Sequence, residues 1–234
     1  MIAWTWLACG GAPAVGPPAL PAETPSVPTC TGRWVSAEPP AAPAEPPTPP
    51  APPGERLYGF AVGDVGLATL SSSGLRVTPI EGDAWEVPVG DAGAVVWAGE
   101  VLVVATAGMG AAEGWRDGRR LWRTSLPGPV RRVSTDPGGR VSADGDEVAI
   151  AMPRHGLAVL KRETGEVLEQ RRATPGALVA VHDADGWWAA LGEGGLSGPS
   201  GGACLPGAAR SVLDVVALDG ARWVLTDQGW LRGL

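Results

Sequence analysis

An internal repeat over residues 57–229 constrains the fold more than any other feature of the sequence. Five ten-residue windows align without gaps, and each is an apolar, mostly β-type run followed by a turn that ends in glycine. Glycine supplies the positive φ that tight hairpin turns need. The windows are LYGFAVGDVG at 57–66, VLVVATAGMG at 101–110, EVAIAMPRHG at 147–156, GWWAALGEGG at 186–195 and GARWVLTDQG at 220–229.

The closing glycines of the windows lie 44, 46, 39 and 34 residues apart, and another apolar run often follows them. The repeat unit is therefore strand, turn, strand, glycine turn, strand, which predicts antiparallel hairpins recurring along the chain. The expected repeat turn glycines are Gly66, Gly110, Gly156, Gly195 and Gly229.

Repeats of about forty residues with three or four antiparallel strands each are typical of β-propellers. One such sheet cannot bury both faces alone, so successive blades stack around an axis. A β-sandwich also uses short strands, but sandwiches do not repeat at this period. We therefore expect an all-β fold over residues 55–234, a small β-propeller of four or five blades. The chain enters at what looks like a second strand, so that terminal strands can share one blade.

The second repeat carries a more specific motif, DGRRLWRTSL at 117–126. It resembles the Asp-Gly-x-x-Leu-Trp signature of PQQ-like propeller repeats, in which the tryptophan docks between blades. This resemblance implies that Trp122 is a blade-docking residue. The third repeat, ETGEVLEQRR at 163–172, keeps Gly165 but has Glu169 in place of the tryptophan. The chain is thus similar to a diverged member of the PQQ-like or WD40-like propeller superfamily.

A proline-rich segment precedes the repeats. Fifteen of the 24 prolines fall between Pro13 and Pro53, and this density favours an extended segment without a core. One island, CTGRWVS at 30–36, interrupts it. We expect residues 10–54 to form a disordered Pro/Ala-rich tether, with the domain boundary near Gly54.

The first residues raise the question of export. Residues 1–9 are an apolar run that ends in Leu-Ala-Cys, and the long tether follows. This arrangement resembles the N-terminus of a bacterial lipoprotein, and the resemblance implies a cleaved signal peptide and lipidation of Cys9. Trp6 stands where leucine is usual, and no Lys or Arg precedes the run. A cleaved secretory peptide and a protein that is not exported are the alternatives.

Two cysteines remain if Cys9 is lipidated, and an oxidising compartment favours pairing them. Cys30 lies in the island of the tether, and Cys204 lies in a glycine-rich stretch. A Cys30–Cys204 disulfide would hold the island against the propeller. Two unpaired thiols are the alternative.

Catalytic and metal-binding patterns are weak in this sequence. His155 and His182 have no second histidine at metal-ligand spacing, and no CxxC motif is present. Asp183 and Asp185 resemble half of a calcium loop without its later ligands. We therefore expect no cofactor, no metal site and no catalytic residues. The formal charge of −7 argues against nucleic-acid binding.

These features together predict a cell-envelope lipoprotein that presents a non-catalytic propeller as a protein-binding or assembly scaffold. The resemblance extends, at the level of the fold, to envelope lipoproteins with PQQ-like propellers that assist outer-membrane protein assembly. The expected partners are an envelope protein and, through the lipid anchor, the membrane; a secreted protein is the alternative. The competing function is an enzyme, a lyase or hydrolase whose site lies in the central channel.

Overall fold

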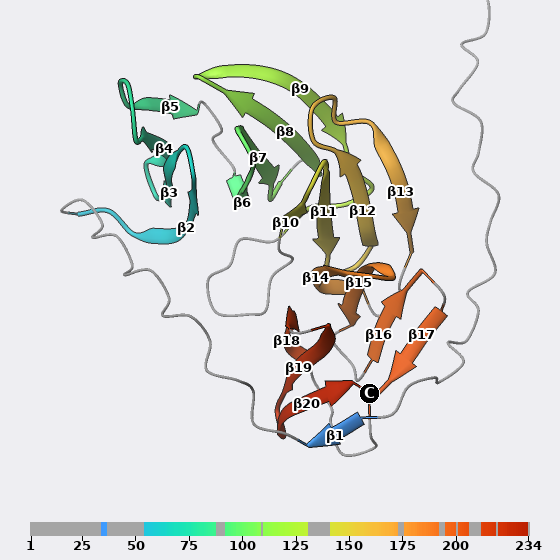
Figure 1. Ribbon diagram of the computed structural model, residues 1–234. Coiled ribbons are helices and arrows are strands. Elements are labelled where there is room, and N and C mark those ends of the chain that lie inside the picture. The colour runs from blue at the N-terminus through green and yellow to red at the C-terminus, as the bar shows by residue number, and fades with distance from the viewer. Residues whose placement is uncertain are drawn as a thin grey trace, which may run out of the picture.

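A computed structural model of the protein describes residues 34–36, 54–87, 92–108, 110–130, 141–172, 176–191, 195–199, 201–205, 212–218 and 220–233. These residues form five four-stranded antiparallel sheets, which are the blades of a small β-propeller (Figure 1). The expected all-β propeller with four or five blades is therefore confirmed. No helix in the described ranges is long and apolar enough to cross a membrane.

The first four sheets are meanders in which strands follow chain order. The first sheet contains β2 (Leu57–Gly63), β3 (Gly66–Ser71), β4 (Gly74–Pro79) and β5 (Trp85–Val87). The second contains β6 (Ala92–Ala98), β7 (Val101–Thr106), β8 (Ala111–Arg116) and β9 (Arg119–Ser125). The third contains β10 (Val141–Asp144), β11 (Glu147–Met152), β12 (Gly156–Lys161) and β13 (Val167–Arg171). The fourth contains β14 (Ala177–Asp183), β15 (Gly186–Leu191), β16 (Gly195–Gly198) and β17 (Gly201–Cys204).

The fifth sheet joins the two ends of the described chain. Its order is β1 (Trp34–Ser36), β20 (Gly229–Gly233), β19 (Ala221–Thr226) and β18 (Val212–Leu218). Strand β1 pairs antiparallel with β20, so that Val35 lies opposite Arg232. Here the structure differs from the expected boundary near Gly54, because the island in the proline-rich segment supplies an edge strand. A sheet that lacks its outer strand offers unpaired backbone groups, and the island is the part of that segment with β-type residues.

The first strand of each sheet lies on the inside of the arc. Strand β2 lies beside β6, β6 beside β10, β10 beside β14 and β14 beside β18. Figure 1 shows the five sheets following one another in this order around the arc. No comparable contact joins β18 to β2 among the described strands.

The core lies between neighbouring sheets. The position of β7 in this core explains why every residue of that strand is buried and why its sequence is almost entirely apolar. All six of its residues are buried. Leu102 and Val104 pack toward the first sheet, whereas Val101 and Val103 pack toward the third. Because side chains alternate between the two faces of a strand, a strand covered on both faces needs an unbroken apolar run.

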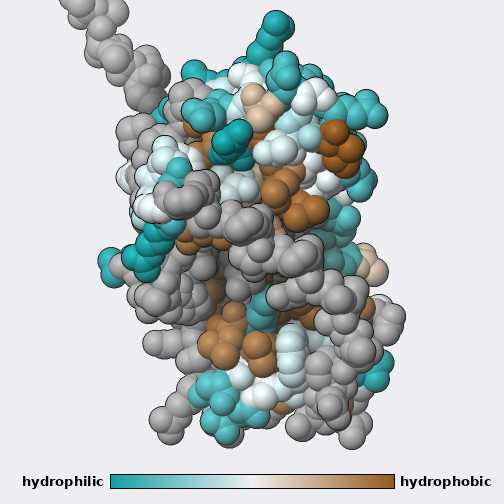
Figure 2. All heavy atoms as spheres, turned by 90° about the vertical axis from the view of Figure 1, so that its left-hand side faces the viewer, coloured by the Kyte–Doolittle hydropathy of each residue, from teal (hydrophilic) through white to brown (hydrophobic). Residues whose placement is uncertain are grey.

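The two terminal sheets are covered less completely than the sheets between them. Every residue of β2 is at least partly exposed, and Val62 is 57% exposed. In β18, Leu213 and Val216 are 41% and 37% exposed. Figure 2 views this side of the arc and shows apolar side chains in an upper and a lower group among hydrophilic ones.

The alignment of the first repeat needs a correction. In the last four windows the apolar run is the second strand of its sheet, but LYGFAVGDVG contains β2, which is a first strand. Gly66 therefore closes the first hairpin of its sheet, and Gly74 at the start of β4 is the equivalent of Gly110 and Gly156. The chain thus does not enter at a second strand. Both hairpins of a blade have the same pattern of apolar run, turn and glycine, so sequence alone does not distinguish them.

Candidate functional site

The turns between first and second strands and those between third and fourth strands lie at the same edge of each sheet. This follows from the meander, because alternate connections of an antiparallel sheet are at the same edge. The two kinds of turn carry most of the exposed carboxylates of the propeller. Examples are Asp64 and Glu81 in the first sheet, and Glu100 and Asp117 in the second. We call this edge the turn face.

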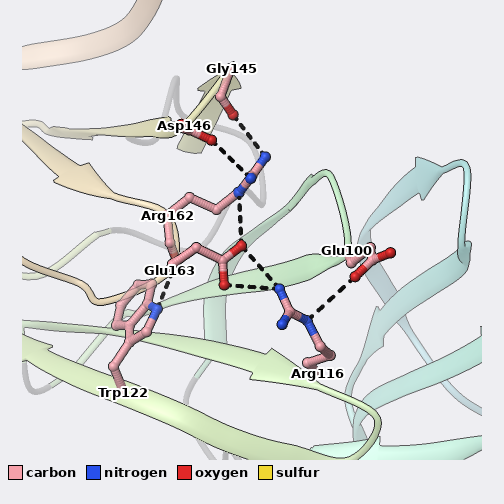
Figure 3. A network of polar contacts seen from close by, with 7 residues as sticks. All are labelled: Glu100, Arg116, Trp122, Gly145, Asp146, Arg162 and Glu163. Carbon is pink, nitrogen blue, oxygen red and sulfur yellow. Dashed lines mark hydrogen bonds and ion pairs between the residues drawn. The ribbon is translucent and has the colours of Figure 1, made fainter.

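Trp122 of β9 contacts the third sheet at the turn face. Its Nε1 donates a hydrogen bond of 2.8 Å to the carbonyl oxygen of Arg162 (Figure 3). The indole covers Gly165, where an added Cβ would lie 2.4 Å from the ring. Gly165 has φ of +68°, so glycine suits this position for two reasons. Trp122 thus contacts the neighbouring blade, as its sequence motif implied.

Trp85 of β5 makes a similar contact with the second sheet, and the sequence analysis missed it. A Cβ on Gly118 would lie 3.6 Å from Cβ of Trp85, so the tryptophan sits over the β8–β9 turn. The signal is EGDAW, in which glycine and tryptophan are three residues apart rather than four. Each tryptophan lies opposite the residue eight positions before it, Val77 for Trp85 and Gly114 for Trp122, so the difference lies in where the glycine stands in the turn.

Arg116 links the second and third sheets at the turn face, and Arg162 of the third sheet shares its partner Glu163 (Figure 3). Nη2 of Arg116 lies 3.0 and 2.9 Å from the two carboxylate oxygens of Glu163. Arg162 pairs with Asp146 at 2.8 Å and with Glu163 at 3.2 Å. The carboxylates at this junction are therefore neutralised by side chains of the protein itself.

The junction of the fourth and fifth sheets uses the same chemistry. The guanidinium of Arg222 pairs with both Asp183 and Asp185. Its Cζ lies 3.7 Å from the centroid of the Trp188 ring, which is a close cation–π contact. The two aspartates that resembled half of a calcium loop thus hold an arginine in this structure.

The junction of the first and second sheets forms an open groove of about 380 Å³ at the turn face. It is a ligand-sized depression, and its lining combines aromatic, apolar and acidic side chains. The lining residues are Asp64, Val65, Val77, Pro79, Ile80, Glu81, Trp85, Trp97, Glu100, Arg116 and Asp117.

The charge of this groove is not balanced. Four carboxylates line it against the single guanidinium of Arg116, which is already engaged by Glu163. Glu100 lies 3.8 Å from Nε of Arg116. No cation of the described residues pairs with Asp64, Glu81 or Asp117.

Trp97 of β6 forms part of the groove lining, and glycine again makes room for it. A Cβ on Gly63 would lie 2.7 Å from Cβ of Trp97, so only glycine fits beneath the indole. Nε1 of Trp97 is buried and has no hydrogen-bond acceptor in the structure. Ile80 at the edge of the groove is 73% exposed, which makes it the most exposed large apolar side chain described.

A second depression, of about 390 Å³, lies against the inner strands β10, β14 and β18. His182 lines it, and its Nδ1 pairs with a carboxylate oxygen of Asp144 in the neighbouring sheet. The His182 ring also meets Trp187 edge-on at 5.0 Å between centroids. The other lining residues are Ala180, Val181, Val215, Val216 and Ala217. His182 belongs to strand β14, directly before the turn to β15.

The remaining predicted residues fall in different parts of the molecule. Gly110, Gly156 and Gly229 have positive φ values of 53°, 94° and 111° at turns after second strands. Gly195 begins β16, and Cys204 ends β17. Cys9 and Cys30 lie outside the described residues, so the lipidation site and the proposed disulfide stay predictions. The described part of the chain contains no cluster of three or more potential metal ligands.

Comparison with known proteins adds a structural relative. The protein is similar to the crystal structure of BamB from Moraxella catarrhalis, with a TM-score of 0.53 and 16% sequence identity. The match covers 74% of this chain and 59% of BamB, so the chain spans less than two thirds of that protein. The computationally designed Ika4 protein matches with a TM-score of 0.45 and 12% identity, over 64% of this chain and 91% of Ika4. No family profile matches the sequence, and neither does any curated protein. The similarity to BamB, a β-propeller, shows a propeller fold for this chain.

Proposed function

We propose that the protein is a cell-envelope lipoprotein whose β-propeller is a binding scaffold for another protein. The observation that carries this proposal is the groove between the first and second sheets. It brings two indoles, an exposed isoleucine and unpaired carboxylates to the turn face. Protein interfaces are enriched in aromatic side chains at their centre and have polar groups around them, as this groove does.

A photo-crosslinking amino acid at position 80 tests the scaffold function in the cells that make the protein. Ile80 is exposed at the edge of the groove, so we expect a discrete adduct of defined mass. Leu168 of β13 is a matched control, because it is 48% exposed and belongs to a different sheet. Absence of any adduct at position 80, or equal adducts at both positions, would contradict a partner at the groove.

The lipid anchor is the second part of the proposal and is supported by the sequence around Cys9. Metabolic labelling with an alkyne analogue of palmitate is expected to mark the wild type and not Cys9→Ser. Equal labelling of the two proteins would exclude Cys9 as the lipidation site.

An oxidising envelope also favours the Cys30–Cys204 disulfide. Mass spectrometry of a non-reduced digest is expected to yield the linked peptide pair. Free thiols at both cysteines in the purified, unreduced protein would exclude the bridge.

A hydrolase or lyase is the competing proposal, and the pair of His182 and Asp144 in the inner depression favours it. A carboxylate that holds an imidazole is a common arrangement for a general base. The lining of this depression includes no serine, threonine or cysteine that could act as a nucleophile. A turnover found in a substrate screen and lost in His182→Ala would favour the enzyme over the scaffold.

A further inference from the structure

We infer that the groove between the first and second sheets binds an arginine side chain presented by the protein partner. This inference rests on the proposed scaffold function and names the chemistry by which the groove would recognise its partner. Three kinds of observation support it: carboxylates with no cationic partner among the described residues, a partly exposed aromatic wall and a comparison with the second and fourth junctions of the same molecule.

The comparison of junctions is the strongest support. We number each junction by the first of the two sheets that it joins. At the second junction, between the second and third sheets, Arg116 and Arg162 lie among carboxylates. At the fourth junction, between the fourth and fifth sheets, Arg222 does. The first junction has carboxylates of the same kind in the equivalent turns. However, Asp64, Glu81 and Asp117 have no cationic partner among the described residues. In this respect the first junction differs from the second and fourth junctions, whose carboxylates are paired with arginines.

The fourth junction shows how the propeller holds a guanidinium. Arg222 stacks on Trp188 and contacts two carboxylates that belong to one turn. The groove offers the same elements, because Trp85 and Trp97 line it together with carboxylates from turns of both sheets. An arginine that enters from outside would find both an aromatic face and negative charge.

Arginine fits these elements better than lysine does. The planar guanidinium stacks on indoles, loses less hydration energy than an ammonium and can form paired hydrogen bonds with a carboxylate. A volume of about 380 Å³ also accommodates this long side chain together with part of its backbone.

Arg116 does not already fill this role. Both of its short contacts are made by Nη2 with Glu163, on the side of the third sheet. Its Nε is buried without a hydrogen-bond partner and lies 3.8 Å from Glu100. If Arg116 neutralises Glu100, the other three carboxylates of the groove still have no cationic partner among the residues that the structure describes.

The test uses fluorescence anisotropy with the purified full-length chain. The probe is a short fluorescein-labelled peptide of alternating glycine and arginine, compared with the same peptide carrying lysine or citrulline. Citrulline keeps the shape of arginine and removes its charge. We expect the arginine peptide to bind about tenfold more tightly than the citrulline peptide, with the lysine peptide between them. Equal affinity for the arginine and citrulline peptides, or for the arginine and lysine peptides, would overturn the inference.

Matched variants place the binding site. Glu81→Gln combined with Asp117→Asn removes two charges from the groove, and asparagine tolerates the positive φ of 48° at position 117. Glu86→Gln combined with Glu166→Gln removes two exposed charges that do not line the groove. We expect about tenfold weaker arginine-peptide binding in the groove variant and less than about twofold change in the control variant. Equal losses in the two variants would indicate attraction to the acidic protein as a whole and overturn the inference.

The partner itself distinguishes this inference from the proposed scaffold function. Crosslinking through position 80 is repeated in the groove variant, after its melting temperature has been compared with that of the wild type to check that it is folded. Loss of the adduct supports arginine recognition. An undiminished adduct would overturn the arginine site and leave the scaffold function standing, whereas no adduct even in the wild-type background would contradict the scaffold function.

Discussion

The contact between Trp122 and Gly165 is expected to be one of the main links between the second and third sheets. The Trp122 side chain is only 8% exposed, donates a hydrogen bond to Arg162 and covers Gly165. Trp122→Ala removes the indole, its hydrogen bond and its packing, which costs about 3–5 kcal/mol of unfolding free energy for a buried tryptophan. Leu121→Ala is the control, because Leu121 is 42% exposed in the same strand and its truncation costs about 0.5 kcal/mol or less.

A double-mutant cycle isolates the contact from general destabilisation. Gly165→Ala places a methyl group 2.4 Å from the Trp122 ring and also strains a backbone with φ of +68°. The clash with the ring disappears when the indole is absent. The close approach to Oγ1 of Thr124, 2.6 Å, and the backbone cost of about 1 kcal/mol persist. We therefore expect the double variant to be more stable than the sum of the single effects by about 1–3 kcal/mol.

Urea unfolding followed by far-ultraviolet circular dichroism measures these differences without relying on tryptophan fluorescence. With an m value of about 2–3 kcal/mol/M, Trp122→Ala is expected to lower the midpoint by about 1–2 M urea. Additive effects in the cycle, or a loss below about 1 kcal/mol for Trp122→Ala, would show that the indole does not hold the two sheets together.

Three further predictions concern the turns and the edges of the propeller. Gly156→Val should lose more stability in urea than Gly156→Asn, because valine is strained at φ of +94° and asparagine tolerates positive φ better; equal midpoints would contradict the turn geometry. Hydrogen bonds from Ser71 and Ser73 hold the pKa of the Glu55 carboxyl below its usual value, so Glu55 stabilises the fold above its unfolded-state pKa and loses this effect as pH falls through the folded-state value. Ser71→Ala should raise that pKa in an NMR titration, and an unchanged pKa would refute the assignment. A chain that begins at Glu55 lacks β1 and should exchange the amide hydrogens of β20 faster than the full chain does, because β1 pairs with β20; identical exchange would show that the pairing contributes nothing.

The repeat alone was enough to predict an all-β propeller. Apolar runs and closing glycines recur at fixed spacing, and only stacked sheets bury both faces of such runs. The same pattern could not distinguish the two hairpins of a blade, so Gly66 was matched with the wrong turn. The pairing of Trp34–Ser36 with β20 also escaped prediction, because three residues carry no periodic signal and their partner lies at the other end of the chain.

Trp122 shows which part of a contact between blades the local sequence predicts. Its motif marked a docking tryptophan, and the structure supplies the acceptor, the carbonyl of Arg162 in the next sheet. Trp85 plays a comparable part without the motif, since the glycine of its turn stands one residue nearer to it than Gly118 does to Trp122.

The groove between the first and second sheets is a property of the tertiary structure. Its carboxylates come from four turns of two sheets, and each of them reads in the sequence as an ordinary polar turn residue. Such a carboxylate is neutralised only where the neighbouring sheet supplies an arginine, as Arg222 neutralises Asp183. The spacing of apolar residues and glycines thus determined the blades, because strand and turn formation depend on near neighbours in the chain. Only the packing of blade against blade decided which of the described charges are paired and which line an open groove, because it joins side chains far apart in sequence.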